Sequence, residues 1–157
     1  MNNPLAPLMA LLAQTEKERD EALQQHQRLE AAFQAAQEQA DQLVNYRRDY
    51  EKRWTTQFAK EGSMPLVNCY QTFNERLTQA VDFQRNAVQQ AQYQAEKGRA
   101  LWMEQEIRVA SVRKLIERRV HEIQLSAERR DQKTTDEFAS RVSWSNTHGH
   151  GASAASS

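Results

Sequence analysis

The chain has 157 residues, of which 39% are hydrophobic and 27% are charged, and its mean hydropathy is -0.90. With four glycines and three prolines, this composition excludes a thick globular core and favours long amphipathic helices. The 21 basic residues balance the 21 acidic ones, so no net field draws the chain to nucleic acid or to anionic lipid. No apolar stretch is long enough to span a bilayer, and the lone cysteine fits a reducing compartment. We therefore expect a soluble, intracellular, all-α protein.

The first helix is predicted over about residues 5–59. Pro4 and Pro7 are tolerated only in its opening turn, where the amides have no partner within the helix. Positions taken alternately three and four residues apart are mostly apolar, which is the pattern of a coiled-coil seam with polar interruptions. The predicted seam positions are Leu5, Leu8, Leu12, Thr15, Arg19, Ala22, His26, Leu29, Phe33, Ala36, Ala40, Leu43, Arg47, Tyr50 and Trp54.

A turn is predicted at about residues 60–64. Gly62 suits the left-handed position after a helix, Ser63 is a good N-cap, and Pro65 fits the first turn of a new helix. So short a connection between long helices forces the chain to double back as an antiparallel hairpin.

The second helix is predicted over about residues 64–140, which makes residues 1–142 one antiparallel coiled coil. Residues 143–157 are rich in Ser, Gly and Ala and are expected to form a flexible, disordered tail. The apolar stripe of the second helix drifts in phase near Gly98, where we expect a local irregularity or a change of partner. The stripe consists of Tyr70, Phe73, Leu77, Ala80, Ala87 and Ala91, followed by Trp102, Val109, Val112, Ile116, Val120, Ile123 and Ala127.

Folding about Gly62 places residues equidistant from the turn side by side. His26 then faces Gly98, and Leu5 lies near Arg119. The last turns of the second helix, about 120–140, project beyond their partner and need another surface to cover them. We expect a docking end there.

Catalytic, cofactor and metal sites are not predicted. The chain has no glycine-rich phosphate loop, no nucleophile elbow and no CxxC pair. His148 and His150 lack a third ligand nearby, which a metal site requires. His26 and His121 are expected to be ordinary seam or surface residues. The protein is therefore not expected to be an enzyme.

A docking surface is predicted on the side of the hairpin. Two half-stripes at helical spacing are set opposite each other by the turn, and together they overfill a two-stranded seam, so some of their aromatic residues must face outward. An ordinary core role is the alternative for part of them. The half-stripes are Gln39, Leu43, Tyr46 and Tyr50, and Phe73, Leu77, Ala80 and Gln84.

Basic residues gather between Arg108 and Lys133, with acidic residues interleaved. The usual explanation is a solvated helix face with ion pairs between successive turns. The alternative is a contact with an acidic ring or groove. DNA binding through a zipper-type basic region is disfavoured, because the acidic residues interrupt it and the predicted pairing is antiparallel within one chain.

In its motifs and their order, the sequence resembles the FliJ family of the bacterial flagellar type III export apparatus. The resemblance covers nearly the whole chain except the tail after Val142. Cys69 is a small departure from the family pattern, and Gln84 stands where a histidine is expected. The matching motifs are Pro7-Leu8 through Leu11-Leu12, Tyr46-Arg47-Arg48-Asp49-Tyr50, Gly62, Asn68-Cys69-Tyr70-Gln71-Thr72-Phe73, Leu77, Trp102, Leu115-Ile116-Glu117-Arg118-Arg119 and Arg129-Arg130-Asp131-Gln132-Lys133.

The resemblance implies a hairpin like the gamma-subunit stalk of rotary ATPases. Such a stalk inserts into the hexameric export ATPase, promotes its assembly and activity, binds the cytoplasmic domain of the export gate membrane protein, and is linked to export chaperones. It implies a cytoplasmic protein, peripheral to the inner membrane at the flagellar base, without direct membrane insertion. The implied gate-binding residues are Gln39, Leu43, Tyr46, Tyr50, Phe73, Leu77 and Ala80. The implied ATPase-binding residues are Leu8, Leu12, Arg19, Arg113, Arg118, Arg119 and Arg130.

Three rival interpretations stay open at this point. The first is the equivalent stalk of a virulence-type injectisome, which would use the same mechanism in another machine. The second is a coiled-coil scaffold that associates with itself. The third is a general export chaperone, which would use the exposed aromatic patch to bind subunit tails.

Overall fold

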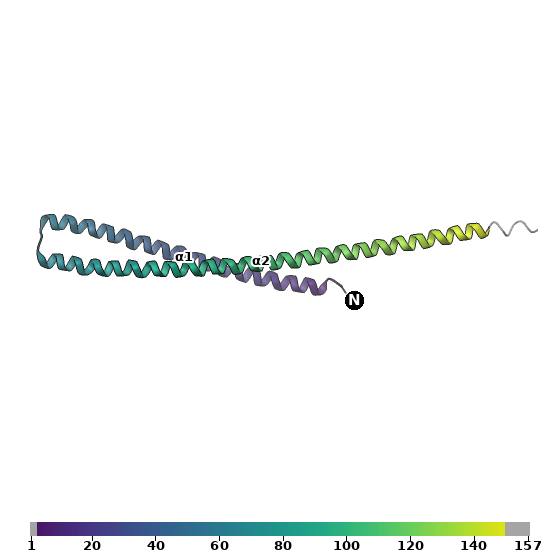
Figure 1. The fold of residues 1–157 in the computed structure, drawn as a ribbon, viewed down its shortest axis with the longest axis horizontal. Helices are drawn as coiled ribbons and strands as arrows, with labels where there is room; N and C mark the ends of the chain where they lie inside the picture. The colour runs from purple at the N-terminus through teal and green to yellow at the C-terminus, as the bar shows by residue number, and fades with distance from the viewer. Residues whose placement is uncertain (1–2, 150–157) are drawn as a thin grey trace, which may run out of the picture. The chain divides into compact units, whose positions relative to one another are not determined.

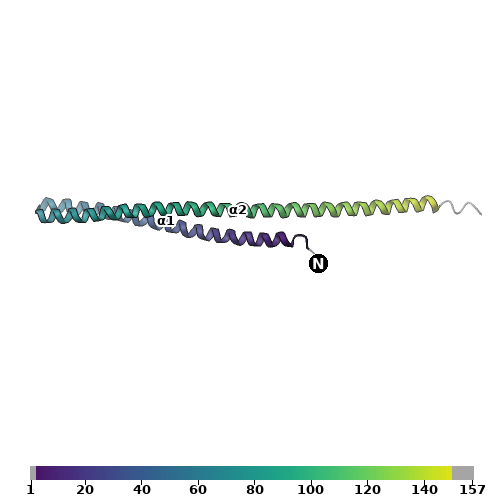
Figure 2. The same ribbon diagram turned by 60° about the horizontal axis from the view of Figure 1, so that its bottom comes forward.

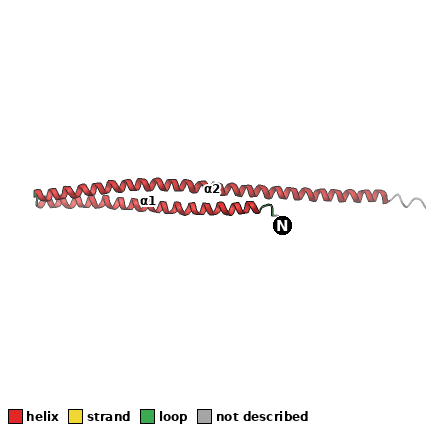
Figure 3. Cartoon of the chain, turned by 90° about the horizontal axis from the view of Figure 1, so that it is seen from below, coloured by secondary structure: helices red, strands yellow, loops and turns green. Residues whose placement is uncertain are grey.

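The computed structural model describes residues 3–149, and these form two helices and no strand. The helices are α1, Ala6–Lys60, and α2, Met64–Gly149 (Figure 3). They pack antiparallel, which confirms the predicted fold class. Neither described helix contains a stretch apolar enough to cross a membrane.

The contacts divide the chain into two units. The hairpin unit is Gln14–Val109, and the terminal unit combines Met1–Ala13 with Ala110–Ser157. Within the hairpin unit, α1 and α2 run side by side in opposite directions on either side of the turn (Figures 1 and 2).

The predicted seam of the first helix is confirmed by burial. All of its positions from Leu5 to Trp54 are buried or half-buried, including the polar residues Thr15 and Arg19. The exposed fraction of Thr15 is 6%. A heptad pattern places one side of a helix against its partner whatever the polarity of each residue, so position in the repeat decides burial here.

The phase drift expected at Gly98 is wrong. Helix α2 continues through Gly98, which is itself buried and faces His26 and Leu29 of α1. The seam keeps its alternating spacing of three and four residues because polar and small residues occupy positions that an apolar stripe would miss. The observed seam is Tyr70, Asn74, Leu77, Val81, Gln84, Val88, Ala91, Ala95, Gly98, Trp102, Gln105, Val109, Val112 and Ile116.

At the turn, the amide of Glu61 donates to the Gln57 carbonyl (2.9 Å) and the amide of Val67 donates to the Ser63 carbonyl (3.2 Å). Ser63 thus directly precedes α2, at the predicted N-cap position. The left-handed backbone expected at Gly62 is wrong, since no described glycine has a positive φ. The three-residue connection reverses the chain without it, so backbone geometry does not require a glycine there.

In the terminal unit, Pro4 borders the same surface depression as Arg119 and Arg130, so the start of α1 lies beside this part of α2. From His121 to Gly149 every residue of α2 is exposed. A helix end that projects beyond its partner, as predicted past about residue 120, would be exposed in this way.

Helix α2 also extends beyond the predicted end at about residue 140, and residues 143–149 are helical where a flexible tail was expected. Local contacts support these turns: the Thr147 hydroxyl donates to the Ser143 carbonyl (2.8 Å), and the rings of Trp144 and His148 stack at 4.2 Å. Composition alone did not reveal these contacts. The remainder of the predicted tail, with His150, lies outside the described residues.

Candidate docking sites

Aromatic rings gather around Tyr50 close to the turn. The Tyr50 ring centroid lies 4.6 Å from that of Phe73 and 5.7 Å from that of Tyr70, both on α2. On α1 it lies 5.9 Å from Trp54 and 6.5 Å from Tyr46. These contacts bring together the two predicted half-stripes, as the hairpin geometry required.

Further ring contacts extend this cluster toward the turn. Trp54 and Phe58 are 5.3 Å apart, and each also contacts Tyr70, at 5.6 and 5.5 Å. Sequence reasoning missed Phe58. Its signal was the four-residue spacing of aromatics along α1, which continues from residue 46 to residue 58. The turn-end aromatic cluster is Tyr46, Tyr50, Trp54, Phe58, Tyr70 and Phe73.

The residues that the family resemblance links to gate binding differ in exposure. Tyr46 is 51% exposed and Phe73 36%, whereas Leu77 retains 8%. Gln39 is exposed, and the others are half-buried. Both earlier interpretations therefore hold in part: Leu77 belongs to the core, while Tyr46 and Phe73 present ring surface to solvent. We call Gln39, Leu43, Tyr46, Tyr50, Phe73, Leu77 and Ala80 the docking face.

Gln84 joins the two helices at one end of this face. Its side-chain amide donates to the Ala36 carbonyl (3.2 Å) and to Oε1 of Gln39 (3.2 Å). A hydrogen bond to the backbone of the opposite helix fixes the register more firmly than apolar contact alone. Gln84 therefore holds Gln39 in place.

The electrostatic environment of Tyr50 follows from its place in the cluster. Partial burial raises the pKa of its hydroxyl above the ordinary value of 10.0, and this effect outweighs a hydrogen bond with Trp54 that lowers it. Cys69, a free and exposed thiol, is near enough to add to the upward shift. Like any tyrosine with an ordinary or raised pKa, Tyr50 is protonated at neutral pH, so it adds no charge to this face.

The residues that the resemblance links to ATPase binding are divided between the two units. Arg19 lies in the hairpin unit and is a seam residue, with its guanidinium 3.1 Å from Asp20 and 3.9 Å from Glu106. The others lie in the terminal unit. There Leu8 and Leu12 are half-buried, while Arg113, Arg118, Arg119 and Arg130 are exposed.

One ion pair of the terminal unit lies within a single helix. Arg119 pairs with Glu122 one turn away, at 3.5 Å, so part of the basic surface is compensated on the same helix. This contact is of the kind expected for a solvated helix face.

The described histidines, His26, His121 and His148, belong to no cluster of metal-binding side chains. Among residues 3–149, no three His, Cys, Asp or Glu side chains come together as a metal site would require. His26 stacks on Trp102, with ring centroids 5.5 Å apart and planes 4° from parallel. It contributes to the seam, opposite Gly98 as predicted.

The sequence corresponds to a known family. A family model described as "Flagellar FliJ protein" matches residues 4–148. The chain belongs to the FliJ family. A curated relative, the "Flagellar FliJ protein" of Salmonella typhi, is 29% identical over 128 residues, which cover 81% of this chain and 86% of the relative. No solved structure matches the chain. As a FliJ protein it is a component of the flagellar export apparatus, in a family that is generally non-enzymatic.

Proposed function

We propose that this FliJ protein is a stalk that links two parts of the export apparatus. The docking face of the hairpin unit binds the cytoplasmic domain of the export gate membrane protein. The terminal unit binds the hexameric export ATPase and promotes its assembly and activity. The protein acts in the cytoplasm at the flagellar base, where the gate holds it beside the inner membrane, and it performs no chemistry of its own.

The observation that carries this proposal is the half-exposed pair of Tyr46 and Phe73 on neighbouring helices. Tyr50 contacts both rings, so the two side chains are held in fixed positions before any partner arrives. Rigid, partly exposed aromatics lose little conformational entropy on binding and are enriched among the residues that dominate interface energies. A partner that covers them would bury apolar surface at low cost.

Two features of the terminal unit support its assignment to the ATPase. The exposed arginines there could contact acidic groups of a ring, and the exposed surface of His121–Gly149 could be covered inside it. Most helical stability in proteins comes from packing against another element, so a partner that covers this exposed segment would stabilise it.

Affinity for the gate domain tests the proposal most directly. The double variant Tyr46→Ala/Phe73→Ala is expected to bind the purified cytoplasmic gate domain about tenfold more weakly, or worse, because truncation of interface aromatics commonly costs 1–2 kcal/mol or more. Phe83→Ala is the matched control, since Phe83 is 76% exposed but lies outside the docking face. Equal affinity of the double variant and the wild type would contradict gate binding through this face.

A further inference from the structure

The two flanks of the hairpin seam differ in charge. One flank consists of residues that recur every seven positions: Gln25, Ala32, Gln39 and Tyr46 on α1, and Phe73, Ala80, Ala87, Gln94 and Leu101 on α2. We call it the neutral flank. The opposite flank has the same spacing but carries Glu30 and Glu51 on α1 and Arg85 and Arg99 on α2. The first series is thus uncharged over these positions, whereas the opposite series mixes charged residues with uncharged ones such as Gln37, Val44 and Thr78.

The ion pair between Glu18 and Arg108 supports this placement of side chains. Both residues continue the seven-residue series of the neutral flank, and their side chains meet across the helices at 3.6 Å. Members of the two series therefore lie on the same side of the seam. Charge returns to this series at Arg53 toward the turn, and at Glu18 and Arg108, where the two residues compensate each other.

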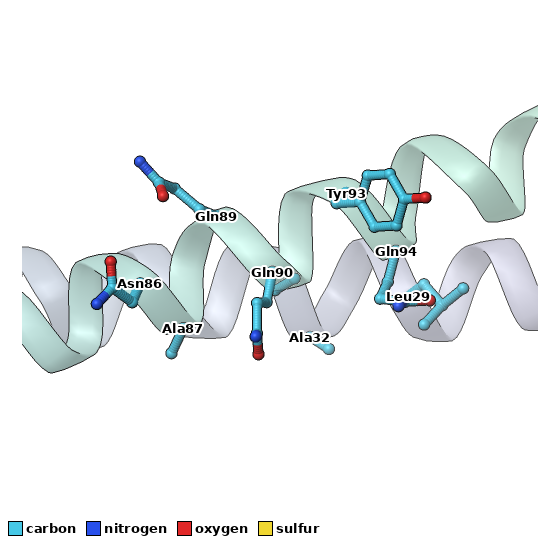
Figure 4. Close-up of a pocket in the computed structure, with 9 residues that line it drawn as sticks. Leu29, Ala32, Asn86, Ala87, Gln89, Gln90, Tyr93 and Gln94 are labelled. Carbon is cyan, nitrogen blue, oxygen red and sulfur yellow. The ribbon is translucent and has the colours of Figure 1, made fainter.

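A groove follows the middle of the neutral flank (Figure 4). It has a volume of about 950 Å³ and lies between α1 and α2. Leu29 and Ala32 of α1 line it beside Asn86, Ala87, Gln90 and Gln94 of α2. No residue that lines it carries a formal charge at neutral pH, although 27% of the chain is charged. The nearby Lys97 ammonium is directed to the Tyr93 ring, 5.5 Å from its centroid.

The groove is held in shape before any ligand binds. The Gln84 amide spans the helices beside it through its bond to the Ala36 carbonyl. Close to its other end, the Leu29 side chain occupies the space beside Gly98, so the helices approach closely there. Because these contacts hold the two helices together, a ligand binds without the cost of rearranging the backbone of the groove.

We propose that this groove binds one amphipathic α-helix of a partner protein, with aliphatic residues on its buried face and uncharged amide or hydroxyl residues on its flanks. The alanine side chains at positions 32, 87 and 91 leave room for large aliphatic side chains. Charged flanks would lose hydration against Asn86, Gln90 and Gln94 without gaining an opposite charge. A third helix laid on two helices shares their heptad spacing, so its contacts repeat along the groove.

Two synthetic peptides test this proposal with the full chain. Both are three-heptad helices with Leu at positions a and d; one has Gln at e and g, and the other has Glu there. In fluorescence anisotropy we expect the Gln peptide to bind the wild type, and the Glu peptide to bind about tenfold more weakly or worse. Equal binding of the two peptides would overturn the proposal, and so would no binding of the Gln peptide.

Variants locate the binding site. Ala87→Lys is expected to lower the affinity for the Gln peptide about tenfold, because it places a charged side chain in the groove. Gln92→Lys is the control on the exposed surface of the same helix and is expected to change affinity by less than about twofold. Circular dichroism verifies that each variant remains helical. Unchanged affinity of Ala87→Lys would place the peptide elsewhere and contradict the proposal.

The alternative occupant, a second copy of this chain, is tested by sedimentation. A wild-type dimer that Ala87→Lys dissociates would assign the groove to self-association and overturn the partner-helix proposal. A monomer would support it. Gate binding and ATPase stimulation of Ala87→Lys are expected to match the wild type, because no docking-face residue lines the groove, although both lie on the neutral flank. Failure of this inference is therefore distinguishable from failure of the proposed stalk function.

Discussion

The side chain of Leu29 occupies the space that a side chain at Gly98 would need. A Cβ atom at position 98 would stand 2.7 Å from Cδ1 of Leu29 and 3.6 Å from the Cα atom of His26. The backbone at Gly98 is ordinary helix, with no positive φ. Glycine is therefore favoured here by the close approach of α1, in a position where it otherwise lowers helix stability.

Gly98→Ala is expected to change the free energy of unfolding by less than about 1 kcal/mol, because the gain in helix propensity offsets the displacement of the flexible Leu29 side chain. In a Leu29→Ala background the displaced group is absent, so the same change is expected to stabilise the protein by about 1 kcal/mol. Urea unfolding of the four proteins in this cycle gives both values. Equal effects of Gly98→Ala in the two backgrounds would show that Leu29 does not limit the space.

The cross-helix ion pair of Glu18 and Arg108 is expected to contribute little to the free energy of unfolding. Glu18→Arg removes the 3.6 Å contact and places like charges together, which should cost about 0.5 kcal/mol because both side chains are well exposed. The exchange Glu18→Arg/Arg108→Glu should recover most of that loss. Thermal unfolding at low and high salt measures the coupling. A double variant no more stable than Glu18→Arg would mean that the two charges do not interact.

The raised pKa of Tyr50 predicts a loss of stability in alkali. As pH rises, the unfolded chain releases the Tyr50 proton near pH 10.0, before the folded chain does. The contribution of Tyr50 to folding stability is therefore complete below that pH and is lost as pH rises through the higher folded pKa. Tyr50→Phe removes the titrating hydroxyl and keeps the ring. Urea unfolding at about pH 9 and about pH 11 should show a larger decrease for the wild type than for Tyr50→Phe. Parallel decreases would exclude Tyr50 as the cause.

The basic residues of the terminal unit are expected to matter for the ATPase. In the presence of Arg113→Glu/Arg118→Glu, half-maximal stimulation of ATP hydrolysis should need about tenfold more protein, because reversed charges oppose association with an acidic surface. Arg48→Glu/Arg53→Glu carries the same charge change in the hairpin unit and is the control. Hydrolysis assays with the purified export ATPase measure both. Equal impairment by the two variants would point to net charge instead of a local contact.

The seam of α1 was predictable position by position because its repeat starts from clear leucines and keeps its spacing. The seam of α2 was predictable only in part. Asn74, Gln84 and Gln105 occupy buried positions that look like surface residues in the sequence, so an apolar stripe drawn without them seemed to shift at Gly98. Spacing measured from Leu77 alone would have retained the register.

The meeting of the two half-stripes was predictable, since hairpin geometry determines which positions lie opposite each other. The division of their residues into core and surface was not. Leu77 and Phe73 belong to the same predicted half-stripe, but the seam buries Leu77 while Phe73 lies beside it on the flank. One step of a heptad decides this difference, and it depends on the exact phase of the partner helix.

Cys69 is the single cysteine of the chain, and its thiol is exposed. It directly precedes Tyr70 of the turn-end aromatic cluster in the sequence. A maleimide fluorophore or spin label attached there would occupy one defined position without any engineered residue. Its emission or mobility would report when a partner approaches the rings of Tyr50 and Phe73. The native sequence thus allows association to be followed in real time.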